Sequence, residues 1–214
     1  TNCNVKNVYH AGICGLSVAE GQITGTQVRA INNPVGYGVV ISRETSEAGD
    51  LVTNPCSRDV TVSGNQVYDV RGWEAFDTHA GIRITFSNNQ AVRCNLGVSI
   101  NPANNAAGLS MYPPVDCVVT GNVLDSGVTD GTAKFGICIS GCARDVHDIL
   151  APGCVIEGNS IRGYGTKGVP LAGAIYCHHT QGLVVDGNTL SGCVNGIQLV
   201  RDNYGTMMGI NPGA

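Results

Sequence analysis

The chain is short of charged and aromatic side chains. Only 13% of its 214 residues are charged and 5% are aromatic, and its only lysines are Lys6, Lys134 and Lys167. The formal net charge is −4, so the sequence lacks the basic surface that nucleic-acid binding requires. No apolar run approaches the roughly 18–20 residues of a membrane span. We therefore expect neither a nucleic acid nor a membrane among its partners.

The chain has ten cysteines but none at CxxC spacing, and its closest pair, Cys138 and Cys142, is four residues apart. There is no CxxC pair, and zinc sites normally need such paired ligands. Most cysteines lie in apolar runs such as GICIS (136–140), where a free thiol behaves as a small hydrophobic side chain. We predict buried free thiols, with some disulfides as the alternative, and neither a metal site nor another cofactor.

Glycine is abundant, at 30 residues, and it recurs within two short motifs that alternate along the chain. The first motif reads VSGNQV (62–67), FSNNQAV (86–92), VTGNVL (119–124), IEGNSI (156–161) and VDGNTL (185–190). The second motif reads GVVIS (38–42), GWEAF (72–76), GVSIN (97–101), GICIS (136–140), AIYCH (174–178) and GIQLV (196–200). The self-similarity covers nearly the whole chain.

The motifs predict strands, because each is too short for a helix and rich in β-branched residues. Two alternating motifs separated by insertions of variable length favour a solenoid over a globular sandwich. Leucine-rich repeats would need a leucine ladder and a recurrent helix, and neither is present. We therefore predict an all-β, right-handed parallel β-helix, a single-stranded solenoid of about seven coils. It spans residues 1–214 and is expected to be part of a longer chain.

An asparagine recurs in the first motif, at Asn65, Asn89, Asn122, Asn159 and Asn188. Asparagine tolerates a left-handed backbone, and its amide can bond to its neighbours in the coils above and below. We predict a structural role for these asparagines at the corners of the coils.

Long insertions are expected in the solenoid on both sides of one coil, residues 74–89. They cover residues 43–59 and 101–115, and we expect them to form two walls around a cleft for a chain-like ligand. A second pair, residues 125–135 and 162–173, is expected to form one protrusion.

The floor of this cleft would come from residues 72–81, GWEAFDTHAG, which hold the only tryptophan of the chain. Successive side chains of a strand point to opposite faces. With Gly72 as the first residue of the second motif, Trp73 points into the core, and Glu74 and Asp77 both point to solvent on one surface. The alternative role for Trp73 is a platform on which a sugar ring stacks.

Two carboxylates and an imidazole cluster on this coil, at Glu74, Asp77 and His79. A glycosidase needs one carboxyl group to protonate the leaving oxygen and a second to attack or to activate water. Glu74 and Asp77 supply such a pair, so we predict these three residues to be catalytic. The alternative is an ordinary polar corner held by its own hydrogen bonds.

The stacked VxGN and GIxI units resemble the β-helix proteins that act on polysaccharides, namely pectate lyases, mannuronan epimerases and phage tailspikes. Asp77-Thr78-His79 is also similar to the Asp-Pro-His motif of the epimerases, although a threonine replaces the proline. In that family the aspartate and histidine lie at the catalytic centre. The resemblance implies a phage tailspike depolymerase that cleaves bacterial surface polysaccharide, with hydrolysis by the carboxylate pair as the leading mechanism.

Two alternatives remain open. A polysaccharide lyase or epimerase would use His79 as the base, with Arg43 or Arg83 to neutralise the substrate carboxylate. A non-catalytic glycan-binding or structural β-helix would need the cleft but no ionised pair.

Six further residues are predicted to bind the glycan because they lie near the cleft or on the same outer surface. They are Arg43, Glu44, Trp73, Arg83, Tyr176 and His179. The tailspike resemblance further implies a homotrimer, and a location on the virion tail or outside the cell.

Overall fold

The computed structural model describes residues 1–31, 33–43, 51–104, 110–127, 133–142, 149–169, 172–204 and 207–208. Regular structure in this part of the chain consists of β-strands and no helix. No segment of it therefore qualifies as a membrane-spanning helix.

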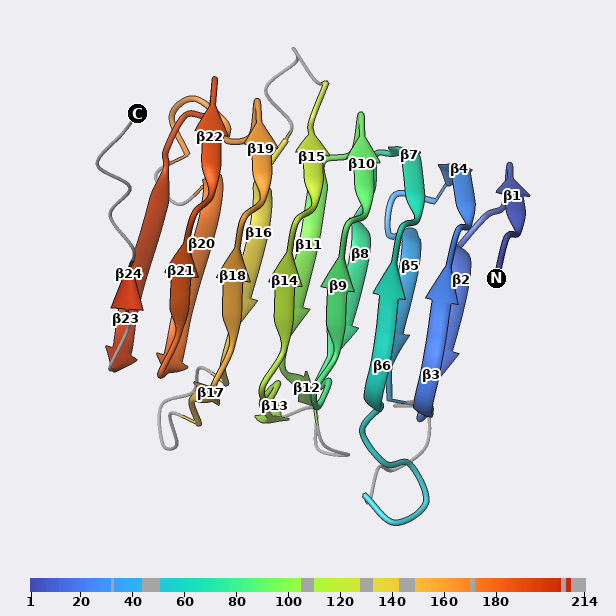
Figure 1. Ribbon diagram of the computed structural model, residues 1–214, viewed down its shortest axis with the longest axis horizontal. Helices are drawn as coiled ribbons and strands as arrows, with labels where there is room; N and C mark the ends of the chain where they lie inside the picture. Colours follow the sequence, from blue (N-terminus) through green and yellow to red (C-terminus); the bar gives the residue numbers. More distant parts are fainter. Residues whose placement is uncertain are drawn as a thin grey trace.

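Three parallel sheets run the length of the molecule (Figure 1). Sheet A comprises β1 (Asn4–Lys6), β4 (Gln27–Ile31), β7 (Gln66–Val70), β10 (Gln90–Val92), β15 (Val123–Asp125), β19 (Ser160–Arg162) and β22 (Thr189–Ser191). Sheet B comprises β2 (Ala11–Leu16), β5 (Tyr37–Ser42), β8 (Glu74–His79), β11 (Leu96–Asn101), β16 (Phe135–Ser140), β20 (Gly173–Gln181) and β23 (Ile197–Tyr204), with β17 (Ala151–Pro152) beside β20. Sheet C comprises β3 (Ala19–Thr24), β6 (Arg58–Ser63), β9 (Thr85–Ser87), β14 (Val118–Thr120), β18 (Val155–Glu157), β21 (Val184–Asp186) and β24 (Met207–Met208).

The chain visits sheets B, C and A in turn, and each strand pairs in parallel with the equivalent strand of the coils before and after it. In Figure 1 the chain rises along the near side through sheets C and A and descends along the far side through sheet B. It advances from the N-terminal end at the right to the C-terminal end at the left, so the winding is right-handed. The predicted right-handed parallel β-helix is confirmed.

The core is built from columns of apolar side chains, one from each coil. Alternation along a strand sends every second residue inward, and registered pairing stacks these residues on one another. Inside sheet A the column contains Val28, Val67, Ala91, Leu124 and Ile161, and inside sheet B it contains Val39, Phe76, Val98, Ile137 and Ile175.

The corner between sheets C and A explains the GN pair of the first motif. Gly121 adopts a φ of 64°, in the left-handed region that favours glycine. In the coil before it Asn88 takes the same place with a φ of 53°. The left-handed residue is thus the one before the recurrent asparagine, whereas the sequence analysis assigned that conformation to the recurrent asparagine.

The recurrent asparagines form a buried ladder, which confirms their predicted structural role. Asn122 Oδ1 accepts hydrogen bonds from Asn89 N at 2.9 Å and from Asn89 Nδ2 at 3.1 Å. The Asn122 Nδ2 group donates in turn to Asn159 Oδ1 at 2.9 Å and to Phe86 O at 2.9 Å. Each amide therefore joins its own corner to the next coil, and no polar atom of it is left to water.

All ten cysteines are free thiols, as predicted. Six of them are buried, namely Cys94, Cys117, Cys138, Cys142, Cys154 and Cys177. Burial raises the pKa of the Cys94 thiol to about 12, so this group acts as a packing side chain and not as a nucleophile.

The predicted insertions lie only partly within the described residues. A short antiparallel hairpin of β12 (Ala103–Asn104) and β13 (Ser110–Tyr112) forms in the insertion 101–115. Residues 44–50 of the first insertion and 128–132 of the predicted protrusion lie outside the described residues.

Candidate functional site

The coil that carries the candidate site has a register different from the one the sequence predicted. Asp77 pairs with Val40 of β5 on one side and with Ser99 of β11 on the other. Ala75, not Gly72, therefore occupies the place of the leading glycine, and the prediction is wrong by three residues. The segment that matches GVVIS (38–42) is AFDTH.

This register moves Trp73 out of the core. Its exposed fraction is 39%, so the predicted inward orientation is wrong. The indole packs edge-on against the Tyr37 ring, with centroids 5.1 Å apart. Trp73 remains available to stack on a sugar ring, which was its alternative role.

Glu74 and Asp77 lie on the outer face of sheet B, opposite the core side chains Ala75 and Phe76. They are nevertheless shielded from water, because Glu74 is 9% exposed and Asp77 is 0% exposed. The prediction that both face solvent is therefore wrong, although the prediction that they share one face holds. Glu74 Oε2 and Asp77 Oδ1 are buried without a hydrogen-bond partner.

His79 connects this pair to solvent. Its Nε2 lies 3.2 Å from Asp77 Oδ2, an ion-pair contact that is not aligned as a hydrogen bond. Its Nδ1 is 3.1 Å from the carbonyl oxygen of Pro102 in the next coil. The His79 side chain is 32% exposed, so it forms the accessible edge of the cluster.

Burial and neighbouring charges change the pKa values of Glu74 and His79. Burial, and then the negative charge of Asp77, raise the pKa of Glu74 from 4.5 to about 7. Burial alone would lower the pKa of His79, but the charge of Asp77 and contacts with Asp77 and the Pro102 carbonyl raise it from 6.5 to about 9. Near neutral pH Glu74 therefore keeps its proton more readily than an ordinary glutamate, and His79 is protonated beside Asp77.

Two residues of the cluster were not predicted as site residues, Tyr37 and Cys138. Burial raises the Tyr37 pKa, and the charges of Asp77 and Glu74 raise it further. Burial, followed by the same two charges, raises the pKa of Cys138 to about 12. Both are neutral groups that line the carboxylates. The corrected register was the signal that could have found Cys138, since it shares an outer column with Asp77.

Arg43 joins the two predicted walls. It is 1% exposed; its Nε donates to Asn54 O at 3.2 Å and its Nη1 donates to Asn104 O at 3.4 Å. The guanidinium also lies 4.5 Å from the ring centroid of Tyr112. Asn54 belongs to the first insertion, and Asn104 and Tyr112 belong to the second. The insertions therefore meet across β8 at this edge, where the sequence analysis placed two separate walls.

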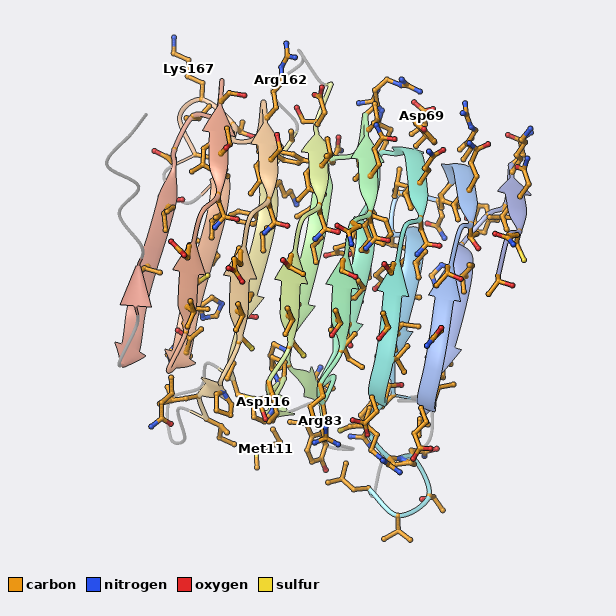
Figure 2. The ribbon with its side chains drawn as sticks, in the orientation of Figure 1. Asp69, Arg83, Met111, Asp116, Arg162 and Lys167 are labelled. Atoms are coloured by element: carbon orange, nitrogen blue, oxygen red, sulfur yellow. The ribbon has the colours of Figure 1, made fainter. Side chains whose placement is uncertain are left out.

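Arg83 lies away from the cluster, at the corner between sheets B and C. Its Nε is 2.6 Å from Asp59 Oδ1 and its Nη2 is 2.9 Å from Asp59 Oδ2. Figure 2 shows Arg83 at the lower edge of the view, near Asp116. This paired, surface-exposed position does not bring Arg83 to the carboxylates.

The remaining predicted binding residues are distant or outside the described chain. Tyr176 and His179 belong to β20, three strands along sheet B from β8. The Tyr176 ring stacks on Phe135 with centroids 5.0 Å apart, and His179 is buried. Glu44 lies outside the described residues. Within the described ranges no group of three potential ligands is arranged to hold a metal ion.

Comparisons with known proteins do not identify a family for this chain. No family model matches the sequence, and no curated protein matches it either. Among solved structures, QnrB1, a plasmid-mediated fluoroquinolone resistance protein, aligns over 92% of this chain and 91% of its own, with 12% identity and a TM-score of 0.19. A likeness at that level supports no statement about fold or function, so the fold rests on the strand topology and the site on its own geometry.

Proposed function

We propose that this chain is a glycan-cleaving β-helix domain whose reacting groups are Glu74 and Asp77. The observation that carries this is the raised pKa of Glu74, about 7, beside the carboxylate of Asp77. A carboxyl group whose pKa is raised beside a second carboxyl group is typical of the general acid in glycoside hydrolysis. Bacterial surface polysaccharide is the proposed substrate, and a homotrimer on a virion tail or outside the cell is the proposed setting.

In this mechanism Glu74 donates its proton to the leaving glycosidic oxygen. Asp77 then serves as the second carboxylate, which attacks the sugar or activates a water molecule. Protonated His79 holds Asp77 in place through the 3.2 Å contact and stabilises its charge. Trp73, at the exposed rim, offers the sugar an aromatic surface.

The lyase or epimerase alternative finds less support. Such a reaction needs an unprotonated base and a free cation, but the pKa of His79 is raised to about 9. The Arg43 guanidinium is buried between two loops, and Arg83 is occupied by Asp59. His79 in this state is an acid, not a base.

A second candidate function is a non-catalytic glycan-binding or structural β-helix. The specific observation that favours it is the complete burial of Asp77, because a reacting carboxylate must meet its substrate or water. Under this alternative the cluster would be a buried polar network on the outer face of sheet B.

The test compares wild type with Glu74→Gln and Asp77→Asn on a panel of bacterial capsular and surface polysaccharides. New reducing ends and the ultraviolet absorbance of an unsaturated uronate are followed together. We expect reducing ends without absorbance, and a loss of at least about 100-fold in rate in each variant. Activity should fall as pH rises through about 7, because Glu74 loses the proton that it donates.

Glu20→Gln and Asp186→Asn are the matched controls, since both residues are exposed and distant from the cluster. They should retain wild-type rates. A rise in absorbance together with reducing ends would move the assignment to a lyase. If no glycan is cleaved, and the two variants still bind as wild type does, the protein is a recognition module.

A further inference from the structure

The outer face of sheet A carries an ordered polar surface that the proposed reaction does not use. Gln27, Gln66 and Gln90 occupy one column on β4, β7 and β10, because each pairs with the next in register. Gln27 Nε2 donates to Gln66 Oε1 at 3.0 Å. The Tyr68 hydroxyl lies 3.1 Å from Gln66 Oε1 and 3.4 Å from Gln90 Oε1. Among the described residues, the amide N–H groups of Gln66 and Gln90 have no acceptor, so they remain as donors toward solvent.

Arginine side chains gather beside this column. The Arg29 guanidinium lies 4.2 Å from the centroid of the Tyr68 ring, and its Nε is buried without a hydrogen-bond partner. Arg93 reaches the same ring at 6.0 Å and is held by Asp69 through contacts of 2.6 and 2.8 Å. Lys6 precedes Arg29 in the same outer column.

The carboxylate of Asp69 interacts with the charges of several arginines. The bond from Arg93 and then the charges of Arg93, Arg71 and Arg29 hold the pKa of Asp69 below its usual range. The charges of three guanidinium groups therefore act on a single carboxylate, and the surface is locally positive on a chain whose net charge is −4. Arg29 makes no ion pair among the described residues, so its charge is available to a ligand.

This surface is continuous with the candidate site. Strand β7 leads directly into β8, and the turn between them holds Arg71 and Trp73, both exposed. Figure 2 shows Asp69 at the upper edge of the view, on the opposite edge from Arg83. A chain that lies along Tyr68 and turns past Arg71 would reach Trp73 and then Glu74.

The geometry points to a second, non-catalytic subsite on sheet A, formed by Arg29, Tyr68 and Arg71, that binds the carboxylate groups of an acidic glycan. A guanidinium fork matches a carboxylate in a bidentate geometry. The amide donors of the glutamine column suit sugar hydroxyls. This inference rests on the proposed function. It adds that the substrate is an acidic polymer and that sheet A binds this polymer without taking part in the reaction.

The test measures binding of polygalacturonate, with uncharged dextran and single-stranded DNA as comparison polymers. It is done in the Glu74→Gln background, so that cleavage does not interfere and the result is independent of catalysis. Arg29→Gln and Arg71→Gln are the test variants. Arg162→Gln is the matched control, since Arg162 is an exposed arginine in the same outer column but beside Asp125.

We expect polygalacturonate to bind more tightly than dextran, and each test variant to weaken it about tenfold at low salt while the control does not. Thermal unfolding checks that the variants are folded, and exposed Arg71 gives a result even if Arg29→Gln is unstable. Equal binding of polygalacturonate and dextran, or an equal loss in the control, would overturn the inference. Tighter binding of DNA, lost in the same variants, would also overturn it by assigning the site to phosphates.

Discussion

His79 Nε2 lies 3.2 Å from Asp77 Oδ2, and Asp77 has no solvent exposure. The imidazole is therefore the group through which a buried carboxylate meets the surface. A charge placed in such a position is costly unless a partner compensates it. Burial is the main reason why the pKa of Glu74 rises, the charge of Asp77 adds to the rise, and the charge of His79 opposes it.

The stability of the protein should depend on pH through Glu74. Its folded-state pKa, about 7, lies above the ordinary value of 4.5, so the folded state keeps a proton that the unfolded chain has released. The contribution is complete below the ordinary pKa and is lost as pH rises through the folded pKa. We expect the free energy of unfolding to fall by roughly 1–3 kcal/mol between about pH 5 and about pH 8. Chemical denaturation over this range measures it.

Glu74→Gln should flatten the lower part of this profile. A decline above about pH 6.5 should remain in this variant, because His79 has a raised pKa and its stabilising contribution is lost as pH rises toward about 9. Exposed Glu20→Gln should leave the whole profile unchanged. An identical slope in Glu74→Gln and wild type would contradict the raised pKa of Glu74.

The asparagine ladder predicts a graded loss of stability along the stack. Asn122→Ala removes the acceptor for two groups of Asn89 and leaves a backbone N–H buried without a partner. We expect a loss of about 2–4 kcal/mol in the free energy of unfolding. Asn188→Ala is the matched comparison, because Asn188 bonds to Asn159 in the same way but is half-buried. Its cost should be smaller, and equal costs would argue against the buried ladder.

The buried arginine at the edge of sheet B should be structural. Arg43→Ala removes the donor that two insertions share, and we expect a loss of about 2–3 kcal/mol together with faster proteolysis of both insertions. Arg58→Ala is the control, since that side chain is 47% exposed, and its cost should stay within about 0.5 kcal/mol. Limited proteolysis and denaturation report the two effects separately. Unchanged cleavage of the insertions in Arg43→Ala would show that they do not depend on this contact.

Thiol labelling should reveal three classes of cysteine. Cys3 and Cys14 are exposed and should react first, Cys56 and Cys193 should react slowly, and the six buried cysteines should react only in denaturant. Mass spectrometry with a thiol-specific alkylating reagent identifies each site. Fewer than ten reactive thiols in denaturant without a reductant would show that disulfides are present.

The repeats were enough to predict the fold, because every coil of a β-helix needs the same types of residue at equivalent positions. A residue that tolerates a left-handed backbone, such as Gly121, precedes each ladder asparagine at the corner, and an aliphatic residue such as Val39 faces the core, so the pattern recurs in the sequence. The free buried thiols follow from the same logic, since a cysteine in an apolar strand fills an inward place.

The register of the candidate coil was not predicted, because its inward-facing positions hold residues that differ from those of the other coils. Ala75 replaces the leading glycine, Phe76 fills the place of a valine, and the polar Thr78 sits where Ile41 and Ile100 lie in the adjacent coils. Gly72, three residues earlier, offered a better but false match. The burial of Arg43 was also hidden, because its partner Asn104 lies 61 residues away in the sequence and in a loop that has no repeat.

The stacking of coils also determines the order in which the molecule should open. The strands of each internal coil pair only with the strands of the coils before and after it, so a solenoid loosens from its ends by fraying. The terminal strands of the sheets or pairings are β1, β2 and β3 at one end and β22, β23 and β24 at the other. Their amides should exchange with deuterium first. Glu74 and Asp77 lie on β8, with coils on both sides. We therefore expect the strand that carries the carboxylate pair to exchange later than the terminal strands.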